Sequence, residues 1–282
     1  MSCGEKAAKT LADVLSESFD SASVAAFESS DEIWNVELHI DGPLDEKALK
    51  QVVRKTAGES VARGLVFGKV AQRDWVAASL EGLKPVAAGR FLVHGSHDRA
   101  QARLAPVPIE IEAALAFGTG HHGTTRGCLF AFDRLIRMRR PRRVLDIGTG
   151  TGVLAIAAAK ALHRRVTGTD IDKVAVDVAS DNARLNRVGP QFTAIHARGV
   201  GAHAIRRSAP YDLVLANILL PPLKLMARPM ARLLAPHAHV ILSGLLPEHA
   251  NAAISAYRAQ GLTLARRQIL DGWATLTLRK GT

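Results

Sequence analysis

The chain has 282 residues, of which 48% are hydrophobic and 22% are charged, a composition that excludes a disordered or collagen-like protein. Its 37 basic and 26 acidic residues give a net charge of +11, which favours approach to polyanions such as RNA and carries no information about the fold. Two cysteines, Cys3 and Cys128, are too few for a disulfide scaffold or for a zinc site of four cysteines.

The apolar segments give no sign of export or of a membrane span. The first residues lack a basic segment followed by an apolar core, and the later apolar runs are interrupted by Arg, His, Pro or Asp. We therefore expect a cytoplasmic protein that does not enter a membrane.

Most of the basic excess is arginine scattered along the chain. A cluster such as 137–143 is typical of a solvated surface, so contact with rRNA is left open.

Residues 1–72 predict a small α+β domain. Apolar residues recur at helical spacing over 6–19, whereas apolar and polar residues alternate over 33–40 as in a strand. The expected elements are helix 6–19, strand 23–27, strand 33–40, helix 45–55 and strand 65–70. This order is one strand short of a ferredoxin-like domain. Either residues 1–4 are the stub of the first strand or that strand is missing.

Residues 73–84 predict a linker helix, and residues 85–282 predict a second domain in which strands and helices alternate. Two short strands, 91–94 and 109–112, come first. The other expected elements are helices 124–138, 153–162, 172–186, 223–234 and 248–260, strands 144–146, 166–170, 192–196, 211–216 and 239–243, and two strands near Thr263 and Ala274. This alternation predicts a Rossmann-like, doubly wound, mostly parallel sheet, whose ligands bind beyond the carboxyl ends of its strands.

A glycine-rich loop follows the first strand of this sheet, in the run Asp146-Ile147-Gly148-Thr149-Gly150-Thr151-Gly152. Alternate glycines let the backbone pass close beneath a ligand, and the helix that follows points free N–H groups at the loop. The dinucleotide fingerprint needs a further glycine at position 153, which is valine, so a nicotinamide dehydrogenase is disfavoured. Asp146 would repel a pyrophosphate and attract a cation.

The next strand ends in a second acid, Asp170, about 20 residues beyond Gly148, the distance at which a carboxylate accepts hydrogen bonds from the hydroxyls of a ribose. The ligand expected from these features is an adenosine derivative with a positive charge and no phosphate. S-adenosylmethionine fits this description.

Two more loops reach the same edge of the predicted sheet. Asn217 directly follows strand 211–216, and its amide can orient the lone pair of an attacking amine. Methylases of base amines usually place an aromatic residue after two prolines at this point, but none follows Pro221-Pro222, which favours an aliphatic amine. The loop 116–125 contains His121 and His122, for which we expect ligand contact and no metal, because no Cys, Asp or Glu stands nearby.

These motifs, in this order, resemble the PrmA family, whose members methylate ribosomal protein L11 with S-adenosylmethionine. The similar segments are 117–125, 146–150, 170–172 and 216–219, with further likeness at 74–75 and 85–93. The resemblance implies that the donor is contacted by Thr125, Gly148, Asp170 and Asn217, to which we add Asp146 and Gly150 of the same loop. It also implies that a ferredoxin-like N-terminal domain docks the protein substrate. His121 and Gly123 depart from the usual Thr and Pro of the family.

The resulting hypothesis is methyl transfer to a lysine ε-amino or chain-terminal α-amino group of a ribosomal protein of the large subunit, by a monomer. Asn217 would orient the nitrogen, while desolvation would help the amine to lose its proton and His121 or His122 could carry that proton away. Two alternatives remain: a methyltransferase that acts on RNA or a small molecule, and a non-catalytic module that binds RNA.

Overall fold

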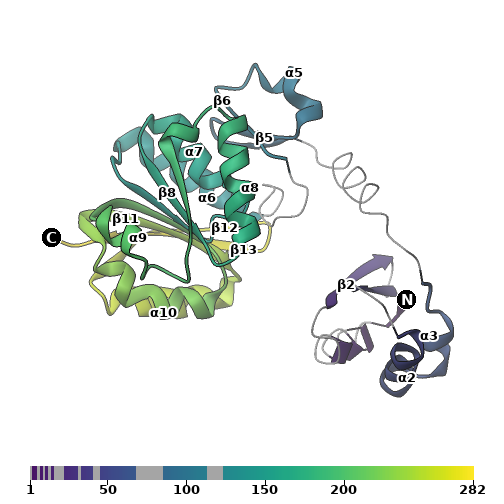
Figure 1. Cartoon of the computed structure of the whole chain (residues 1–282). Helices are drawn as coiled ribbons and strands as arrows, with labels where there is room; N and C mark the ends of the chain where they lie inside the picture. The colour runs from purple at the N-terminus through teal and green to yellow at the C-terminus, as the bar shows by residue number, and fades with distance from the viewer. Residues whose placement is uncertain are drawn as a thin grey trace. The chain divides into compact units, whose positions relative to one another are not determined.

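The computed structural model describes residues 2–4, 7–8, 10–11, 14–15, 22–30, 33–40, 45–67, 85–112 and 123–282. Its contacts divide the chain into two compact units, Met1–Ala71 and Gln72–Thr282, both drawn in Figure 1. The linker helix expected over 73–84 lies outside the described residues. In the part of the chain that is described, no helix is both long and apolar enough to cross a membrane.

The first unit contains an antiparallel sheet of order β1-β3-β2, built from β1 (Ser2–Cys3), β2 (Ala22–Ser30) and β3 (Ile33–Ile40). Ser2 and Cys3 pair with β3, as expected for the stub of a strand. Helices α2 (Glu46–Ala57) and α3 (Glu59–Arg63) follow. The strand expected from residue 65 was wrong for 65–67, which belong to no strand, and 68–70 lie outside the described residues. The ferredoxin-like arrangement therefore stays a prediction.

Helix α2 begins where the sequence predicts because Asp45 caps it. The Asp45 Oδ1 atom accepts hydrogen bonds from the backbone N–H groups of Lys47 and Ala48, at 2.9 and 3.0 Å. Leu49 and Val53, one turn apart on the helix, are buried in the core of the first unit. The apolar side of this helix therefore packs into the core, as its periodicity predicts.

The second unit starts with a small sheet of order β4-β5-β6, formed by β4 (Val86–Ala88), β5 (Phe91–His94) and β6 (Val107–Glu110). The short helices η1 (Ser96–Asp98) and α5 (Arg99–Ala102) join β5 to β6. Strand β6 starts two residues earlier than expected and includes Pro108, which an edge strand tolerates because one row of its N–H groups is unpaired.

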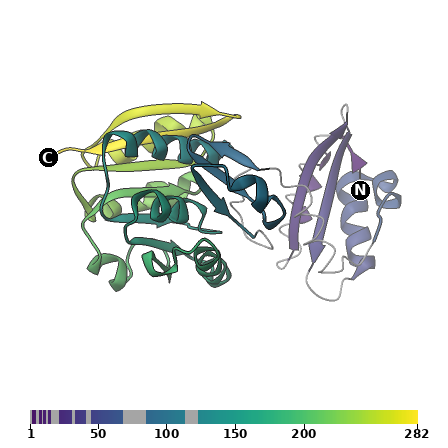
Figure 2. The same ribbon diagram turned by 90° about the horizontal axis from the view of Figure 1, so that it is seen from above.

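The main sheet has seven strands in the order β12-β13-β11-β10-β7-β8-β9. All are parallel except β13, which runs antiparallel to both of its neighbours. The strands are β7 (Val144–Ile147), β8 (Val166–Asp170), β9 (Phe192–His196), β10 (Tyr211–Asn217), β11 (Leu234–Leu245), β12 (Leu262–Leu270) and β13 (Trp273–Lys280). Figure 2 shows β12 and β13, in yellow, at one edge of the sheet.

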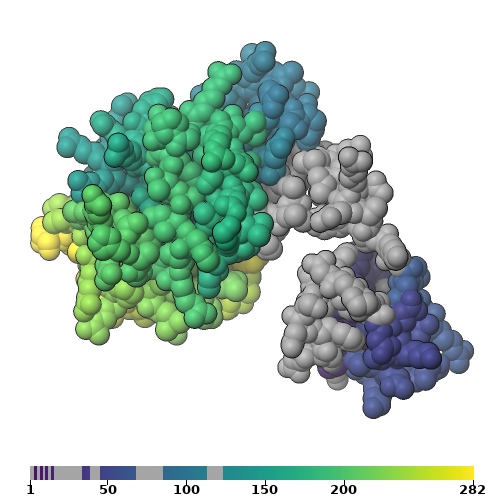
Figure 3. All heavy atoms as spheres, viewed as in Figure 1, coloured from purple at the N-terminus to yellow at the C-terminus, as the bar shows by residue number. Residues whose placement is uncertain are grey.

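Helices cover both faces of this sheet (Figure 1). They are α6 (Gly123–Met138), α7 (Val153–Leu162), α8 (Lys173–Leu185), α9 (His203–Arg207), α10 (Leu220–Ala231) and α11 (Ala250–Arg258), with short 3₁₀ turns η2 (Gly189–Gln191) and η3 (Pro247–His249). Alternate residues of β10 face opposite cores: Leu213 packs with α6 and α7, while Val214 packs with α10 and α11. Figure 3 shows all heavy atoms in the same view, in which α8 lies on the surface of the second unit.

Helix α10 begins three residues before the expected start. Pro221 and Pro222 occupy its first turn, where the backbone N–H groups have no partner within the helix and a missing N–H costs nothing. This early start matters for the site, because it leaves only Ile218 and Leu219 between the end of β10 and the helix.

Candidate functional site

The glycine-rich loop joins β7 to α7 and is fixed to the neighbouring strand β8. Gly148, Gly150 and Gly152 have φ angles of +68°, +53° and +84°, in the left-handed region that glycine adopts without strain. The backbone N–H groups of Gly148 and Thr149 both donate to the carbonyl oxygen of Thr169, at 2.8 and 2.9 Å. The loop is therefore held in one conformation by main-chain bonds.

Two of these glycines are also required by their protein neighbours. A Cβ atom on Gly148 would lie 2.3 Å from Cγ2 of Ile218, the residue after Asn217. A Cβ atom on Gly152 would lie 3.1 Å from Cβ of Ala179 on α8, so Gly152 supplies the close packing that the valine at 153 does not. The sequence pattern identified the loop but not these partners.

Asp170, at the end of β8, meets the loop as predicted. Its Oδ2 atom accepts a hydrogen bond from the Gly150 N–H at 2.9 Å, and its Oδ1 atom accepts one from the Asp172 N–H at 3.0 Å. The side chain is only partly buried, so each carboxylate oxygen keeps capacity to accept a further bond. A ligand with two adjacent hydroxyls can bind here.

Asp146 lies deeper than the sequence indicates, because its side chain is buried at the end of β7. Its Oδ2 atom accepts bonds from the Thr149 hydroxyl at 2.7 Å and from the Ala155 N–H at 3.2 Å. Its Oδ1 atom is buried and has no hydrogen-bond partner among the described residues. Burial raises the pKa of Asp146 to about 7, although the two hydrogen bonds act in the opposite direction.

We expect the buried Asp146 to make the protein less stable as the pH rises from about 4 to about 7. In this window the folded protein retains a proton that the unfolded chain releases, so the free energy of unfolding falls; above pH 7 both states are ionised and the effect is complete. Urea denaturation at a series of pH values measures it. Asp146→Asn should flatten this part of the profile, and superimposable profiles for the two proteins would contradict the assignment.

Asn217 and Thr125 are brought together from the end of β10 and the first turn of α6. The Asn217 amide donates to the Thr125 hydroxyl at 3.2 Å and, more weakly, to the Thr124 hydroxyl at 3.4 Å. Asn217 is partly exposed, whereas Thr125 is buried. The pair therefore holds the amide in a fixed orientation at the edge of the sheet where the glycine loop also lies.

Sequence reasoning missed two glycines that allow this contact. A Cβ atom on Gly244 of β11 would lie 2.5 Å from the carbonyl oxygen of Ile218, so this glycine lets β11 pass beneath the segment that follows Asn217. A Cβ atom on Gly127 would lie 2.2 Å from the Thr275 hydroxyl, so α6 packs closely on β13. Neither glycine belongs to a recognisable motif.

Two buried asparagines were also missed, one within α8 and one at its C-terminal cap. Asn182 donates to the Thr151 carbonyl at 2.9 Å and accepts from the Glu112 N–H at 3.2 Å. One turn later, Asn186 accepts from the Glu110 N–H at 3.0 Å. Together they fasten the end of β6 to the glycine loop. The available signal was the presence of two asparagines at i and i+4 on the buried side of a helix.

The loop residues Phe117, His121 and His122 lie outside the described residues. Within the described ranges, no group of three or more His, Cys, Asp or Glu side chains is arranged as a metal site. The structure thus brings Gly150 to Asp170, Gly148 to the segment after Asn217, and Asn217 to Thr125, all at the carboxyl ends of β7, β8 and β10.

The strand order β9-β8-β7-β10-β11 is that of a doubly wound nucleotide-binding sheet, and the reversed β13 lies between β11 and β12. With its glycine loop and the acid after β8, the second unit has the fold of a class I methyltransferase. A solved ribosomal protein L11 methylase from Lactobacillus delbrueckii subsp. bulgaricus is similar in fold, with a TM-score of 0.64 and 24% identity, covering 71% of this chain and 100% of that one.

The family model Ribosomal protein L11 methyltransferase (PrmA) matches residues 2–281, and the chain belongs to this family. A relative named ribosomal protein L11 methyltransferase in Bradyrhizobium diazoefficiens is 55% identical over 98% of this chain and 94% of its own length. One of the same name in Rhodopseudomonas palustris is 53% identical over the same shares. The family and the fold class expected from the sequence are confirmed.

Proposed function

We propose that the protein transfers methyl groups from S-adenosylmethionine to amino groups of ribosomal protein L11. The observation that carries this proposal is the family relationship, which extends over residues 2–281 and includes relatives of this name at 55% and 53% identity. The positions of Gly150, Asp170 and Asn217 at the carboxyl ends of neighbouring strands also support the proposal, because these residues suit the binding of the methyl donor.

The residues at this edge fit the methyl donor. The free acceptor capacity of Asp170 suits the two hydroxyls of a ribose, and the left-handed Gly148 and Gly150 leave the loop without side chains that would block the ligand. The buried and unpaired Oδ1 atom of Asp146 suits a cationic group, which would favour the ionised carboxylate. The donor-binding residues are Thr125, Asp146, Gly148, Gly150, Asp170 and Asn217.

The donor supplies a methyl group on a sulfonium, which is already a good leaving group, so the protein mainly orients the amine and excludes water. Asn217 is the catalytic residue of this scheme. Its Nδ2 atom is engaged by Thr125, and its Oδ1 atom has no partner among the described residues and can accept a hydrogen bond from the substrate nitrogen. A lysine ammonium, with a pKa of about 10.4 in water, must lose a proton first, and apolar neighbours such as Ile218 and Leu219 favour the neutral amine.

Lysine ε-amino groups, the chain-terminal α-amino group or both are the acceptors in this proposal, and the first unit docks the substrate protein. L11 belongs to the large ribosomal subunit, so we place the enzyme in the cytoplasm, acting as a monomer that can contact rRNA. The excess of 37 basic over 26 acidic residues supports the contact with rRNA. The family relationship favours neither a methyltransferase that acts on RNA or a small molecule nor a non-catalytic RNA-binding module.

Incubation with S-adenosylmethionine labelled on its methyl group tests the substrate class. The purified chain is given L11 or rRNA in separate reactions, and we expect acid-stable label in L11 only. Amino-acid analysis should recover the label as methylated lysine or methylated terminal residue. Label that appears in rRNA and not in L11 would contradict the proposed function.

A further inference from the structure

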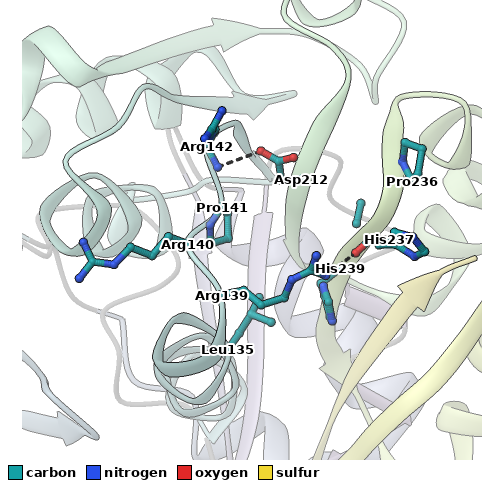
Figure 4. A pocket seen from close by; sticks show the side chains of 10 residues that line it. Leu135, Arg139, Arg140, Pro141, Arg142, Asp212, Pro236, His237 and His239 are labelled. Carbon is teal, nitrogen blue, oxygen red and sulfur yellow. Dashed lines mark hydrogen bonds between the residues drawn. The ribbon is translucent and has the colours of Figure 1, made fainter. Parts of the chain in front are cut away.

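A second site lies at the amino ends of β7, β10 and β11. This is the end of the main sheet opposite to the carboxyl ends of the strands, where the candidate donor site lies. It is a pocket of about 150 Å³ between the end of α6, the connection to β7 and the start of β11. Figure 4 shows the residues that line it. The basic pocket is defined by Arg139, Arg140, Arg142, Asp212, His237 and His239. Asn217 lies five positions after Asp212 along β10, so about 17 Å lies between this pocket and the proposed catalytic site.

The charges of the basic pocket are not balanced. Asp212 is its one carboxylate, and the Asp212 Oδ2 atom is used by the backbone N–H groups of Arg142 and Arg143 at 2.8 and 2.9 Å. The Arg139 guanidinium donates to the carbonyl oxygen of His237 at 2.9 Å. In the part of the chain that the structure describes, no ion pair joins Arg139, Arg140 or Arg142 to a carboxylate. Three exposed guanidiniums thus lack an anionic partner.

The pKa of His239 is sensitive to the positive charges around the basic pocket. Burial lowers the pKa of His239, and the charges of Arg139 and Arg279 lower it further. Arg279 is the cross-strand partner of His239, and its guanidinium lies 3.3 Å from Nδ1 of His237. An anion bound beside these guanidiniums would offset their positive charge and raise the pKa of His239 again.

The geometry of the basic pocket fits several phosphates in succession better than one small molecule. Its volume is below the roughly 300 Å³ at which sites for small ligands begin. Figure 4 shows that Arg139, Arg140 and Arg142 point in different directions and do not converge on one point. A guanidinium binds phosphate through paired hydrogen bonds, and arginines spread over a surface match the repeated phosphates of a nucleic acid.

We propose that the basic pocket is a binding surface for the phosphate backbone of RNA. The choice of RNA over other polyanions rests on the proposed function, because the proposed substrate is a ribosomal protein and so itself a component of an RNA-containing particle. The surface lies on the edge of the sheet away from the donor, so RNA bound there leaves the glycine loop and Asn217 free for the methyl acceptor.

The test compares two double variants that each remove two positive charges. Arg140→Gln with Arg142→Gln alters the pocket, and neither guanidinium makes an intramolecular bond among the described residues. Arg258→Gln with Arg266→Gln is the matched control, at exposed positions on α11 and β12 outside the pocket. Binding to fluorescein-labelled oligouridylate is followed by fluorescence anisotropy without donor, and thermal unfolding checks that both variants fold.

For the pocket variant we expect the Kd for oligouridylate to rise about tenfold, and the slope of log affinity against log salt to fall by about 1.4, or about 0.7 for each lost phosphate contact. The control should bind as the wild type does. RNA should also raise the pKa of His239 in an NMR titration. Equal loss in both variants, no binding by the wild type at about 50 mM salt, or a pocket-dependent affinity for phosphatidylserine vesicles and not for RNA would overturn the proposal. A chain that binds RNA through the pocket but fails to methylate L11 would refute only the proposed function.

Discussion

Asn217→Ala should lower the rate of methyl transfer to L11 by about a hundredfold while the protein remains folded. The amide is the polar group that ends β10, and Thr125 holds its Nδ2 atom at 3.2 Å so that its oxygen can meet the substrate nitrogen. Alanine removes this contact and lets the amine sample unproductive orientations. Steady-state transfer of labelled methyl groups, with kcat and KM measured separately for L11, determines the loss.

The hydrogen bonds that Asn217→Ala removes are long, at 3.2 and 3.4 Å, and the side chain is partly exposed. We therefore expect the free energy of unfolding to change by less than about 1 kcal/mol. Asn251→Ala, at an exposed position on α11, is the matched control and should keep wild-type activity. A hundredfold loss that came with a collapse of stability, or turnover equal to that of the control, would remove Asn217 from the mechanism.

Gly148→Ala should destabilise the protein by about 3 kcal/mol and weaken donor binding. The left-handed φ of +68° costs an alanine about 1 to 2 kcal/mol. The added Cβ would also stand 2.3 Å from Cγ2 of Ile218, so the segment after Asn217 must move. Urea denaturation measures the stability, and calorimetric titration with S-adenosylmethionine measures the affinity.

Gly261→Ala separates the two contributions to this effect. Gly261 has a φ of +80°, but a Cβ there would have no heavy atom within 4 Å. It joins α11 to β12, away from the glycine loop. We expect Gly261→Ala to lower the free energy of unfolding only by the cost of the left-handed backbone, about 1 to 2 kcal/mol, and to bind the donor as the wild type does. If both variants lost the same stability and kept the same affinity, contact between the glycine loop and Ile218 would have no role in the site.

The parts of the fold that the sequence predicted are those set by local signals. The run from Asp146 to Gly152 and the acid at 170 identify the ends of two parallel strands, because glycine spacing and alternating apolar segments are read within a few residues. The start of α10 was placed too late, since prolines at 221 and 222 were taken to precede the helix although they are tolerated inside its first turn.

The parts of the site that the sequence did not predict depend on residues far apart in the chain. Asn182 joins Thr151 to Glu112 across three segments, and Gly244 is needed only because Ile218 lies against it. The depth of Asp146 likewise depends on how α7 packs over β7, and so its raised pKa has no signature in the motif itself. Local periodicity contains no information on such contacts.

The mass of ribosomal protein L11 in living cells tests the central claim most directly. L11 is purified from cells that carry this gene, from cells in which it is deleted, and from deleted cells that express either the wild-type chain or the Asn217→Ala variant. We predict that intact-protein mass spectrometry finds methyl groups on L11 only where the wild-type chain is present. L11 of the same mass in the first two strains would contradict the account.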